Sequence, residues 1–227
     1  AKADLLVFVD DDNVLDPDYL RRAVDIDRRC PFLGAWGCGD LQPEFEVKPP
    51  NWTESYWTML AVGTIREDVW SNLRDQLSTV PCGAGLCVRS RVAREYRRLC
   101  GEHALRSEFD RRGADLTSGG DTDLALCACD LGLGTGMFRE LKLIHLIAKS
   151  RLSLNHLAKL AEAMALSGEL LWAVRGQTRP SPRRGLVGRA IDYYHRLRLT
   201  KESRTIHDAR VRGRTRASSL LKDCKKS

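Results

Sequence analysis

The sequence predicts an α/β fold, an open sheet with flanking helices, followed by a helical C-terminal extension. Two observations carry this prediction. Short apolar runs alternate with helical patterns up to about residue 150, and from Arg151 onward apolar residues recur only at helical spacing. With 227 residues, 43% of them hydrophobic and 30% charged, the chain can bury a sizeable core and has a globular rather than a disordered composition.

The first quarter of the chain supplies two expected strands and one helix. An uninterrupted apolar run predicts a strand over residues 5–9, buried on both faces. Asp16 followed by Pro17 is typical of a helix start and predicts a helix over residues 17–29. Residues 33–38 form the next predicted strand. Prolines and aromatic residues over 41–52 then predict an irregular loop that faces a substrate.

Two further strands and two helices are expected between residues 80 and 147. The apolar, glycine-containing run 80–88 predicts a strand that another backbone or a ligand can approach closely. Residues 90–99 predict a basic helix. Leu124 to Leu131 shows helical spacing with Gly132 directly after it as a C-cap, and 141–147 predicts the last strand.

The remainder divides into an extension and a tail, which gives domains 1–150, 151–200 and 201–227. An apolar stripe follows Arg151, and residues 186–199 form a second amphipathic stretch. The segment 201–227 holds nine Lys or Arg and three Asp or Glu, so it carries +6 of the net charge of +7. Such a tail contacts an anionic membrane peripherally or only keeps the protein soluble. We do not expect a nucleic-acid partner.

The cysteines and the hydropathy pattern indicate the compartment. None of the eight cysteines lies in a CxxC pair or near a histidine at zinc-finger spacing, which predicts free thiols in a reducing cytosol. No apolar run approaches the ~20 residues that span a bilayer, and there is no signal peptide. We therefore expect a cytoplasmic protein, in peripheral contact with the inner membrane face if the tail binds lipid. Because the chain begins at Ala1 without an initiator Met, we expect a piece of a longer protein.

Three consecutive carboxylates, Asp10-Asp11-Asp12, follow the first predicted strand. If the chain stays extended, Asp10 and Asp12 point the same way and Asp11 faces away. Ligands of open α/β sheets bind beyond the carboxyl ends of the strands, and Mg²⁺ typically takes one or two carboxylates and substrate phosphates. The triplet is therefore either a metal and diphosphate site or an ordinary acidic turn.

Two later segments add candidate groups. Asp121 and Asp123 open the predicted helix after Gly120, where a carboxylate can act as a general base. An acidic residue at a helix N-terminus is also favoured by the helix dipole alone. His145, in the last predicted strand, is a metal ligand, a hydrogen-bonded core residue or a surface residue, and imidazole favours Mn²⁺ over Mg²⁺.

Taken together, the pieces resemble a family-2 glycosyltransferase of the GT-A fold. The resemblance covers about residues 1–160 and consists of four segments in the family's order: LLVFVDDDNVLDPDYL, with an Asp-x-Asp motif after a strand, CGAGLCVRSRVAREY, SGGDTDLALCACDLGLGTG and LKLIHLIAKSRL. It implies a GT-A-like sheet that is incomplete at the N-terminus. It also implies inverting transfer of a sugar from a nucleotide-sugar donor to a hydroxyl of a glycan or lipid-linked acceptor, dependent on Mn²⁺ or Mg²⁺.

The resemblance assigns roles residue by residue. Asp10, Asp11 and Asp12 match the donor-binding motif, in which Asp10 and Asp12 hold the metal and diphosphate. His145 matches a position that completes the metal shell in some relatives. Asp121 matches the catalytic base.

On the acceptor side, the resemblance implies contacts from Gly83 and Gly85 in the glycine-rich segment, and Asp123 is a further candidate for positioning the acceptor. Trp52 is an aromatic candidate for stacking on a sugar face. Gly120 stands where many relatives carry Glu, so the role of that Glu is not assigned to any residue of this chain. Residues that bind the nucleotide base in the family precede the segments found here.

Two other classes remain as alternatives. A phosphatase of the haloacid dehalogenase type also has Asp-x-Asp after a strand, but it expects an acidic residue where this chain has Ala125. A non-enzymatic module that binds a sugar nucleotide or glycan, or that docks to a membrane, would account for the basic end and for the missing base-binding portion.

Overall fold

The computed structural model describes residues 3–102, 105–106, 119–176, 194 and 196–223. The chain divides into two compact units, Ala1–Ala104 with Gly120–Lys149, and Leu105–Gly119 with Ser150–Ser227. Among the described residues, every strand belongs to the first unit, and the second unit is helical. The predicted α/β class with a helical C-terminal part is therefore confirmed.

One mixed sheet of seven strands forms the centre of the first unit, in the order β1-β6-β3-β7-β2, with β4 added to β3 and β5 added to β7. β1, β3 and β7 run in the same direction, because β6 is antiparallel to both β1 and β3 while β3 and β7 are parallel. The strands are β1 (Leu5–Phe8), β2 (Asn13–Leu15), β3 (Leu33–Phe45), β4 (Gly63–Thr64), β5 (Val69–Ser71), β6 (Leu86–Arg89) and β7 (Gly134–Ile147).

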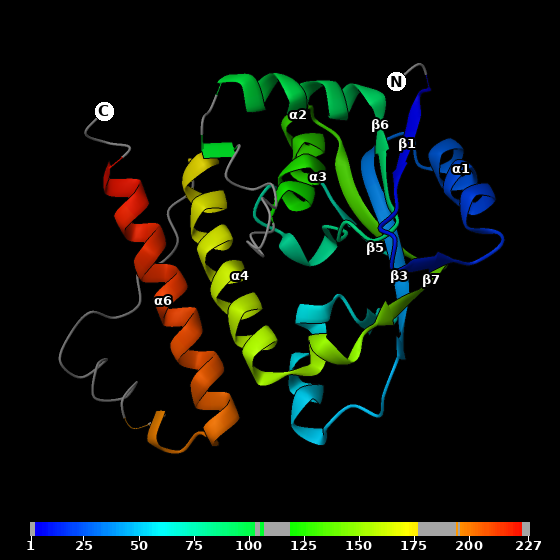
Figure 1. Ribbon diagram of the computed structural model, residues 1–227. Helices are drawn as coiled ribbons and strands as arrows, with labels where there is room; N and C mark the ends of the chain where they lie inside the picture. Colours follow the sequence, from blue (N-terminus) through cyan, green and yellow to red (C-terminus); the bar gives the residue numbers. More distant parts are fainter. Residues whose placement is uncertain (1–2, 103–104, 107–118, 177–193, 195, 224–227) are drawn as a thin grey trace. The chain divides into compact units, whose positions relative to one another are not determined.

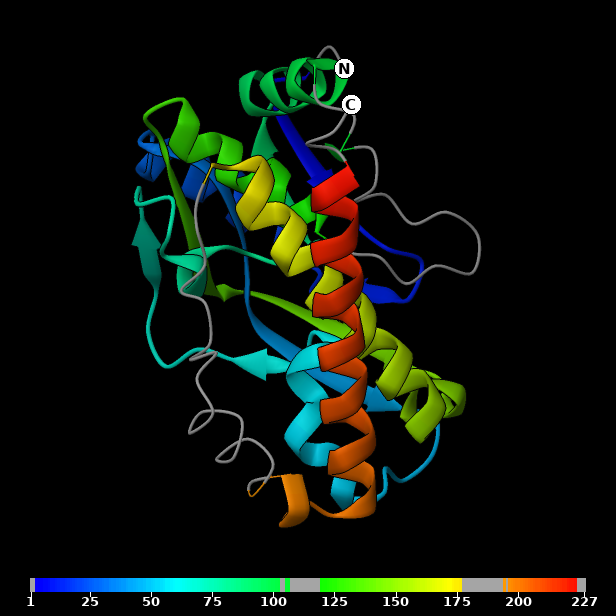
Figure 2. The ribbon, with the colours of Figure 1, turned by 90° about the vertical axis from the view of Figure 1, so that its left-hand side faces the viewer.

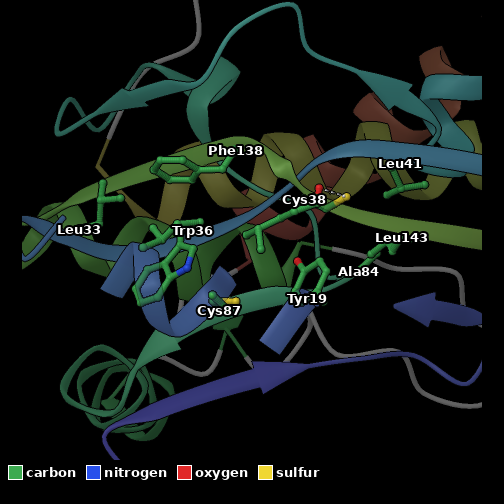
Figure 3. Packing of buried hydrophobic residues seen from close by; sticks show 12 residues of the cluster. Tyr19, Leu33, Trp36, Cys38, Leu41, Ala84, Cys87, Phe138 and Leu143 are labelled. Atoms are coloured by element: carbon green, nitrogen blue, oxygen red, sulfur yellow. Dashed lines mark hydrogen bonds between the residues drawn. The ribbon is translucent and has the colours of Figure 1, made fainter. Parts of the chain in front are cut away.

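Helices cover the two faces of this sheet (Figure 1). α1 (Tyr19–Arg29) packs on one face, where its buried side chains join Trp36 and Cys38 of β3 in one apolar cluster. α2 (Ser90–Glu102) and α3 (Gly120–Asp130) supply a second cluster, which packs on the opposite side chains of β3 and β6. Figure 3 shows the first cluster, in which Trp36, Tyr19 and Cys87 lie together.

The first strand was predicted to be buried on both faces, and this is wrong. β1 pairs only with β6, so it is an edge strand of the described sheet. Its side chains are half-buried, Phe8 is 42% exposed, and Val9 beyond the strand is 46% exposed. An apolar run shows that a segment is suited to a strand, but its burial depends on what pairs beside it.

The third strand is longer than predicted and takes in the first part of the expected loop. β3 continues to Phe45 because Asp40–Phe45 pair with Lys142–Ile147 of β7. β4 pairs β3 only at Asp40 and Leu41, so the stretch beyond has one neighbouring strand, and a proline such as Pro43 is tolerated there. The predicted loop ends within the first two residues of the 3₁₀ helix η1 (Asn51–Leu60).

The strand predicted over residues 80–88 forms only at its end, as β6. Before it, the chain passes through the 3₁₀ helix η2 (Leu77–Thr79) and a glycine-containing loop. Gly85 adopts a left-handed backbone (φ +73°), and a Cβ there would lie 2.4 Å from the Tyr19 hydroxyl. That hydroxyl donates to the Gly85 carbonyl at 2.6 Å, so this glycine is required by a turn and a close approach.

Local signals located the helices of the first unit well. Asp16 begins the turn before α1, where its carboxylate accepts from the Asp18 N–H at 3.0 Å. α2 begins at Ser90, as predicted, and extends three residues past the predicted end. α3 ends at Asp130, and Gly132 follows with the left-handed backbone (φ +73°) expected of a C-cap.

The second unit pairs two long helices, α4 (Leu154–Val174) and α6 (Lys201–Asp223), which lie side by side and run in the same direction (Figures 1 and 2). The 3₁₀ helix η4 (Lys149–Leu152) precedes α4, and Ser153 caps α4 by accepting from the His156 N–H at 3.2 Å. At Gly213 of α6, a Cβ would lie 2.2 Å from the Glu162 carbonyl oxygen, so the glycine lets the two backbones approach closely.

The predicted boundary at residue 200 does not separate two units. Most of 201–227, expected as a tail, forms α6, because Ile206, Ala209 and Ala217 make a buried stripe at helical spacing. The amphipathic stretch predicted over 186–199 lies mostly outside the described residues.

The seven described cysteines are all free, as predicted. In the part of the chain that the structure describes, no helix is long and apolar enough to cross a membrane.

Candidate functional site

The candidate residues gather at one end of the sheet in the first unit. β1, β3 and β7 are parallel, so their carboxyl ends point in the same direction, the side on which open α/β sheets bind ligands. Phe8 of β1 pairs with Leu86 of β6, which brings the chain after β1 next to the loop before β6. Asn13 of β2 pairs with His145 of β7, which brings the acidic triplet next to β7.

The triplet forms a turn and does not continue the strand. β1 ends at Phe8, and the Asn13 N–H donates to the Asp10 carbonyl at 3.1 Å. The expectation that Asp11 faces away from Asp10 and Asp12 rested on an extended chain, so this argument is wrong. Asp11 and Asp12 both line the same cavity.

Asp12 and His145 face each other. The Asp12 Oδ2 lies 3.4 Å from the His145 Nε2, and the imidazole is largely buried. On the other side of the ring, Nδ1 lies 2.9 Å from the Leu60 carbonyl oxygen. A carbonyl only accepts, so Nδ1 carries a proton, and a neutral ring then has its Nε2 lone pair towards the Asp12 carboxylate.

A cation would fit between the Asp12 carboxylate and the Nε2 atom of His145. A lone pair and a carboxylate oxygen that face each other are both acceptors, so either a proton on Nε2 or a metal cation joins them favourably. Metal-binding histidines usually donate their second N–H to a carbonyl or carboxylate, as His145 does to Leu60. Within the described ranges, no group of three or more His, Cys, Asp and Glu is arranged to hold a metal, so Asp12 and His145 would need water or substrate oxygens as further ligands.

The backbone next to Leu60 has an unusual conformation. Ala61 has φ 52° and ψ 42°, and it is the non-glycine residue with positive φ among those described. A left-handed backbone costs an L-residue about 1 kcal/mol. Ala61 directly follows Leu60, whose carbonyl accepts from His145. The conformation of Ala61 therefore helps to set the direction of the Leu60 carbonyl.

Asp121 is held by backbone N–H groups at the start of α3. Its Oδ2 accepts from the Gly83 N–H at 2.7 Å, and its Oδ1 accepts from the Thr122 N–H at 2.8 Å. The Thr122 hydroxyl also donates to Oδ1, at 3.5 Å. A carboxylate oxygen has two lone pairs, so Oδ2 keeps capacity for one more donor, such as an acceptor hydroxyl. The carboxylate therefore has a fixed orientation and remains able to accept a proton.

Two of the candidate carboxylates affect the Cys82 thiol. Burial raises the pKa of this thiol, and the negative charges of Asp121 and Asp10 raise it further. Electrostatic effects of this kind fall off with distance. Asp10 and Asp121, which are far apart in the sequence, therefore both lie within electrostatic range of the same thiol.

The predicted acceptor residues have different surroundings. Gly83 contacts the proposed base, and a Cβ there would lie 3.1 Å from the Asp121 Oδ2. Gly85 has the structural role with Tyr19 given above. Asp123 is completely buried in α3, so its carboxylate is not accessible to an acceptor in this conformation. Trp52 lies in η1 with its ring edge against Tyr56, at 6.3 Å between centroids.

A cavity of about 470 Å³ adjoins Asp12. Four acidic and four apolar residues line it: Asp11, Asp12, Glu44, Phe45, Glu46, Leu146, Ile147 and Ala148. The Phe45 ring, which lines this cavity, packs against Trp57 with 5.0 Å between the ring centroids.

Several of these residues were missed in the sequence. Glu44 and Glu46 alternate as a strand requires, but they fell inside the predicted loop. Leu60 and Ala61 act through the backbone, which leaves no residue-type signal.

Comparisons of this chain with protein-family models, curated proteins and solved structures found no match.

Proposed function

We propose that the first unit is the catalytic part of an inverting family-2 glycosyltransferase with a GT-A-type sheet. It would transfer a sugar from a nucleotide-sugar donor to a hydroxyl of a glycan or lipid-linked acceptor. Two contacts support the proposal. Asp12 faces His145 at 3.4 Å. Asp121 accepts from Gly83 in the loop before β6, which lies next to the chain that leaves β1.

Asp121 performs the proton transfer in this proposal. The acceptor oxygen attacks the anomeric carbon, the bond from that carbon to the diphosphate oxygen breaks, and the hydroxyl proton passes to the Asp121 carboxylate. The nucleoside diphosphate leaves with the bonding electrons. Backbone N–H groups of Gly83 and Thr122 keep the carboxylate in one orientation, which spares reorganisation during the step.

The acidic turn serves the donor. Asp12 and His145 would hold Mn²⁺ or Mg²⁺, with Asp10 and Asp11 as nearby oxygen groups towards the donor. When bound, such an ion neutralises charge on the departing diphosphate. The imidazole favours Mn²⁺. The Leu60 carbonyl holds the ring through Nδ1, so that Nε2 faces the Asp12 carboxylate.

The test measures nucleoside diphosphate released from a panel of nucleotide sugars, by the longest natural form of the protein that contains this chain. Asp121→Asn removes the proton acceptor but keeps the shape, so we expect a loss of about 10²- to 10⁴-fold. Asp130→Asn, at the other end of α3 and paired with Arg74 at 3.1 Å, is the matched control and should keep turnover. Full turnover in Asp121→Asn, or no release from any donor by the wild type, would refute the proposal.

A further inference from the structure

The outer surface of α6 is strongly basic. The helix carries two described acidic side chains, Glu202 and Asp208, and the latter is held by Arg196 at 2.7 Å. Its exposed basic side chains are distributed along the whole length, over about 32 Å at 1.5 Å per residue, and they are Lys201, Arg210, Arg212, Arg214, Arg216 and Lys222.

Packing within the second unit keeps these charges outward. Small and apolar side chains make the stripe of α6 that packs on α4, with Gly213 at the closest approach. Two arginines reach carboxylates of α4, Arg212 at 2.9 Å from Glu162 and Arg214 at 3.9 Å from Glu169. With 3.6 residues per turn, Lys201 and Lys222 lie on the side of the helix away from the stripe, and Arg210 and Arg216 flank it.

We infer that this outer face of α6 binds an anionic phospholipid surface, with the helix lying flat on the headgroups. A row of exposed Lys and Arg attracts anionic lipid, and each basic side chain near such a surface contributes about a fivefold increase in affinity. Val211 is 46% exposed and Leu220 is 37% exposed among these cations. A bilayer interface accommodates apolar side chains between basic ones.

Nucleic acid is the competing anionic surface, and α6 suits it less. The helix contains no Phe, Trp or Tyr between Lys201 and Asp223, so it offers no ring on which a base could stack. The proposal does not depend on the glycosyltransferase activity, because it rests on the second unit alone.

The test compares two triple variants of the full chain that each remove three positive charges. Lys201→Gln, Arg216→Gln and Lys222→Gln change three exposed basic side chains of α6 other than the two arginines paired with α4. Arg91→Gln, Arg94→Gln and Arg97→Gln change three exposed arginines of α2 and are the matched control. Substitutions are used because deleting α6 would expose its packing partner α4. Glutamine is chosen because it keeps good helix propensity. Circular dichroism and thermal unfolding check that both variants fold.

Binding is measured by co-sedimentation with vesicles of phosphatidylcholine containing phosphatidylserine, and with phosphatidylcholine alone. We expect the wild type to bind only the anionic vesicles, and the α6 variant to bind them about 100-fold more weakly. The α2 variant should bind nearly as the wild type does. Equal loss in both variants would mean that net charge alone drives binding, and tighter binding to a duplex oligonucleotide than to the vesicles would favour nucleic acid. Either result overturns the inference.

Discussion

The two carboxylates of the candidate site are held in different ways. Asp12 faces a side chain, His145, whose orientation depends on a carbonyl in η1. Asp121 is held directly by two backbone N–H groups, one from its own helix and one from Gly83. In the first arrangement a carboxylate faces an imidazole nitrogen, and a proton or a metal cation would join the two favourably. In the second, both carboxylate oxygens already accept hydrogen bonds, and Oδ2 keeps a lone pair for a further donor. Under the proposed function, the first would hold a cation and the second would accept a proton.

The largest expected effect is on the cation side. His145→Gln removes the imidazole lone pair, so we expect Mn²⁺ affinity to fall by at least about 10- to 100-fold, the range seen even for groups that only support a ligand. Isothermal titration with Mn²⁺ measures it. His207→Gln, which removes an imidazole from the second unit, serves as the control. If Mn²⁺ binds equally well to the His145 variant, the cation role of this side is wrong.

An intermediate effect is expected on the proton side. Gly83→Ala puts a Cβ 3.1 Å from the Asp121 Oδ2, so the carboxylate must shift by a few tenths of an ångström. We expect turnover to fall by up to about tenfold, less than the 10²-fold that a 1 Å misplacement can cost, with Mn²⁺ affinity unchanged.

Gly101→Ala, where a Cβ meets nothing within 4 Å, is the matched control for Gly83→Ala. A drop in Mn²⁺ affinity together with turnover would show that the two sides of the site are not independent.

The smallest effect concerns Ala61. Ala61→Val places a β-branched side chain on a left-handed backbone, which is less tolerated than alanine and should lower the free energy of unfolding by about 1–2 kcal/mol. It should also weaken Mn²⁺ binding a few-fold, because the Leu60 carbonyl loses its fixed direction. Ala61→Gly fits the backbone and should keep Mn²⁺ affinity. Denaturant unfolding and the same titration distinguish the two, and equal Mn²⁺ affinity in both variants would contradict a positioning role.

Local signals predicted much of the fold. Asp16, Ser90 and Gly132 mark helix ends through contacts within a few residues, and the structure has helix ends within three residues of these positions, with α1 beginning at Tyr19 rather than at Pro17. Strand lengths were less predictable, because β3 extends to Phe45 only through pairing with a strand about a hundred residues later. The burial of β1 likewise depends on distant neighbours.

The candidate site divides in the same way. Asp12, Asp121 and His145 could be selected from the sequence because residue type and position after a strand or before a helix are local properties. The partners that orient them could not. The Leu60 carbonyl and the Gly83 N–H are backbone groups whose direction is set by the turns around them. No pattern of residue types predicts such a contact.

The thiols of the apolar cluster under α1 give the protein an internal reporter of unfolding. Burial raises the pKa of Cys38 and of Cys87 to about 12, so neither is a thiolate near neutral pH while the sheet is intact. Cys30 and Cys100 are only partly buried. Alkylating reagents therefore reach the first pair only when the sheet opens, and the rate of their labelling gives the free energy of that opening without any added probe.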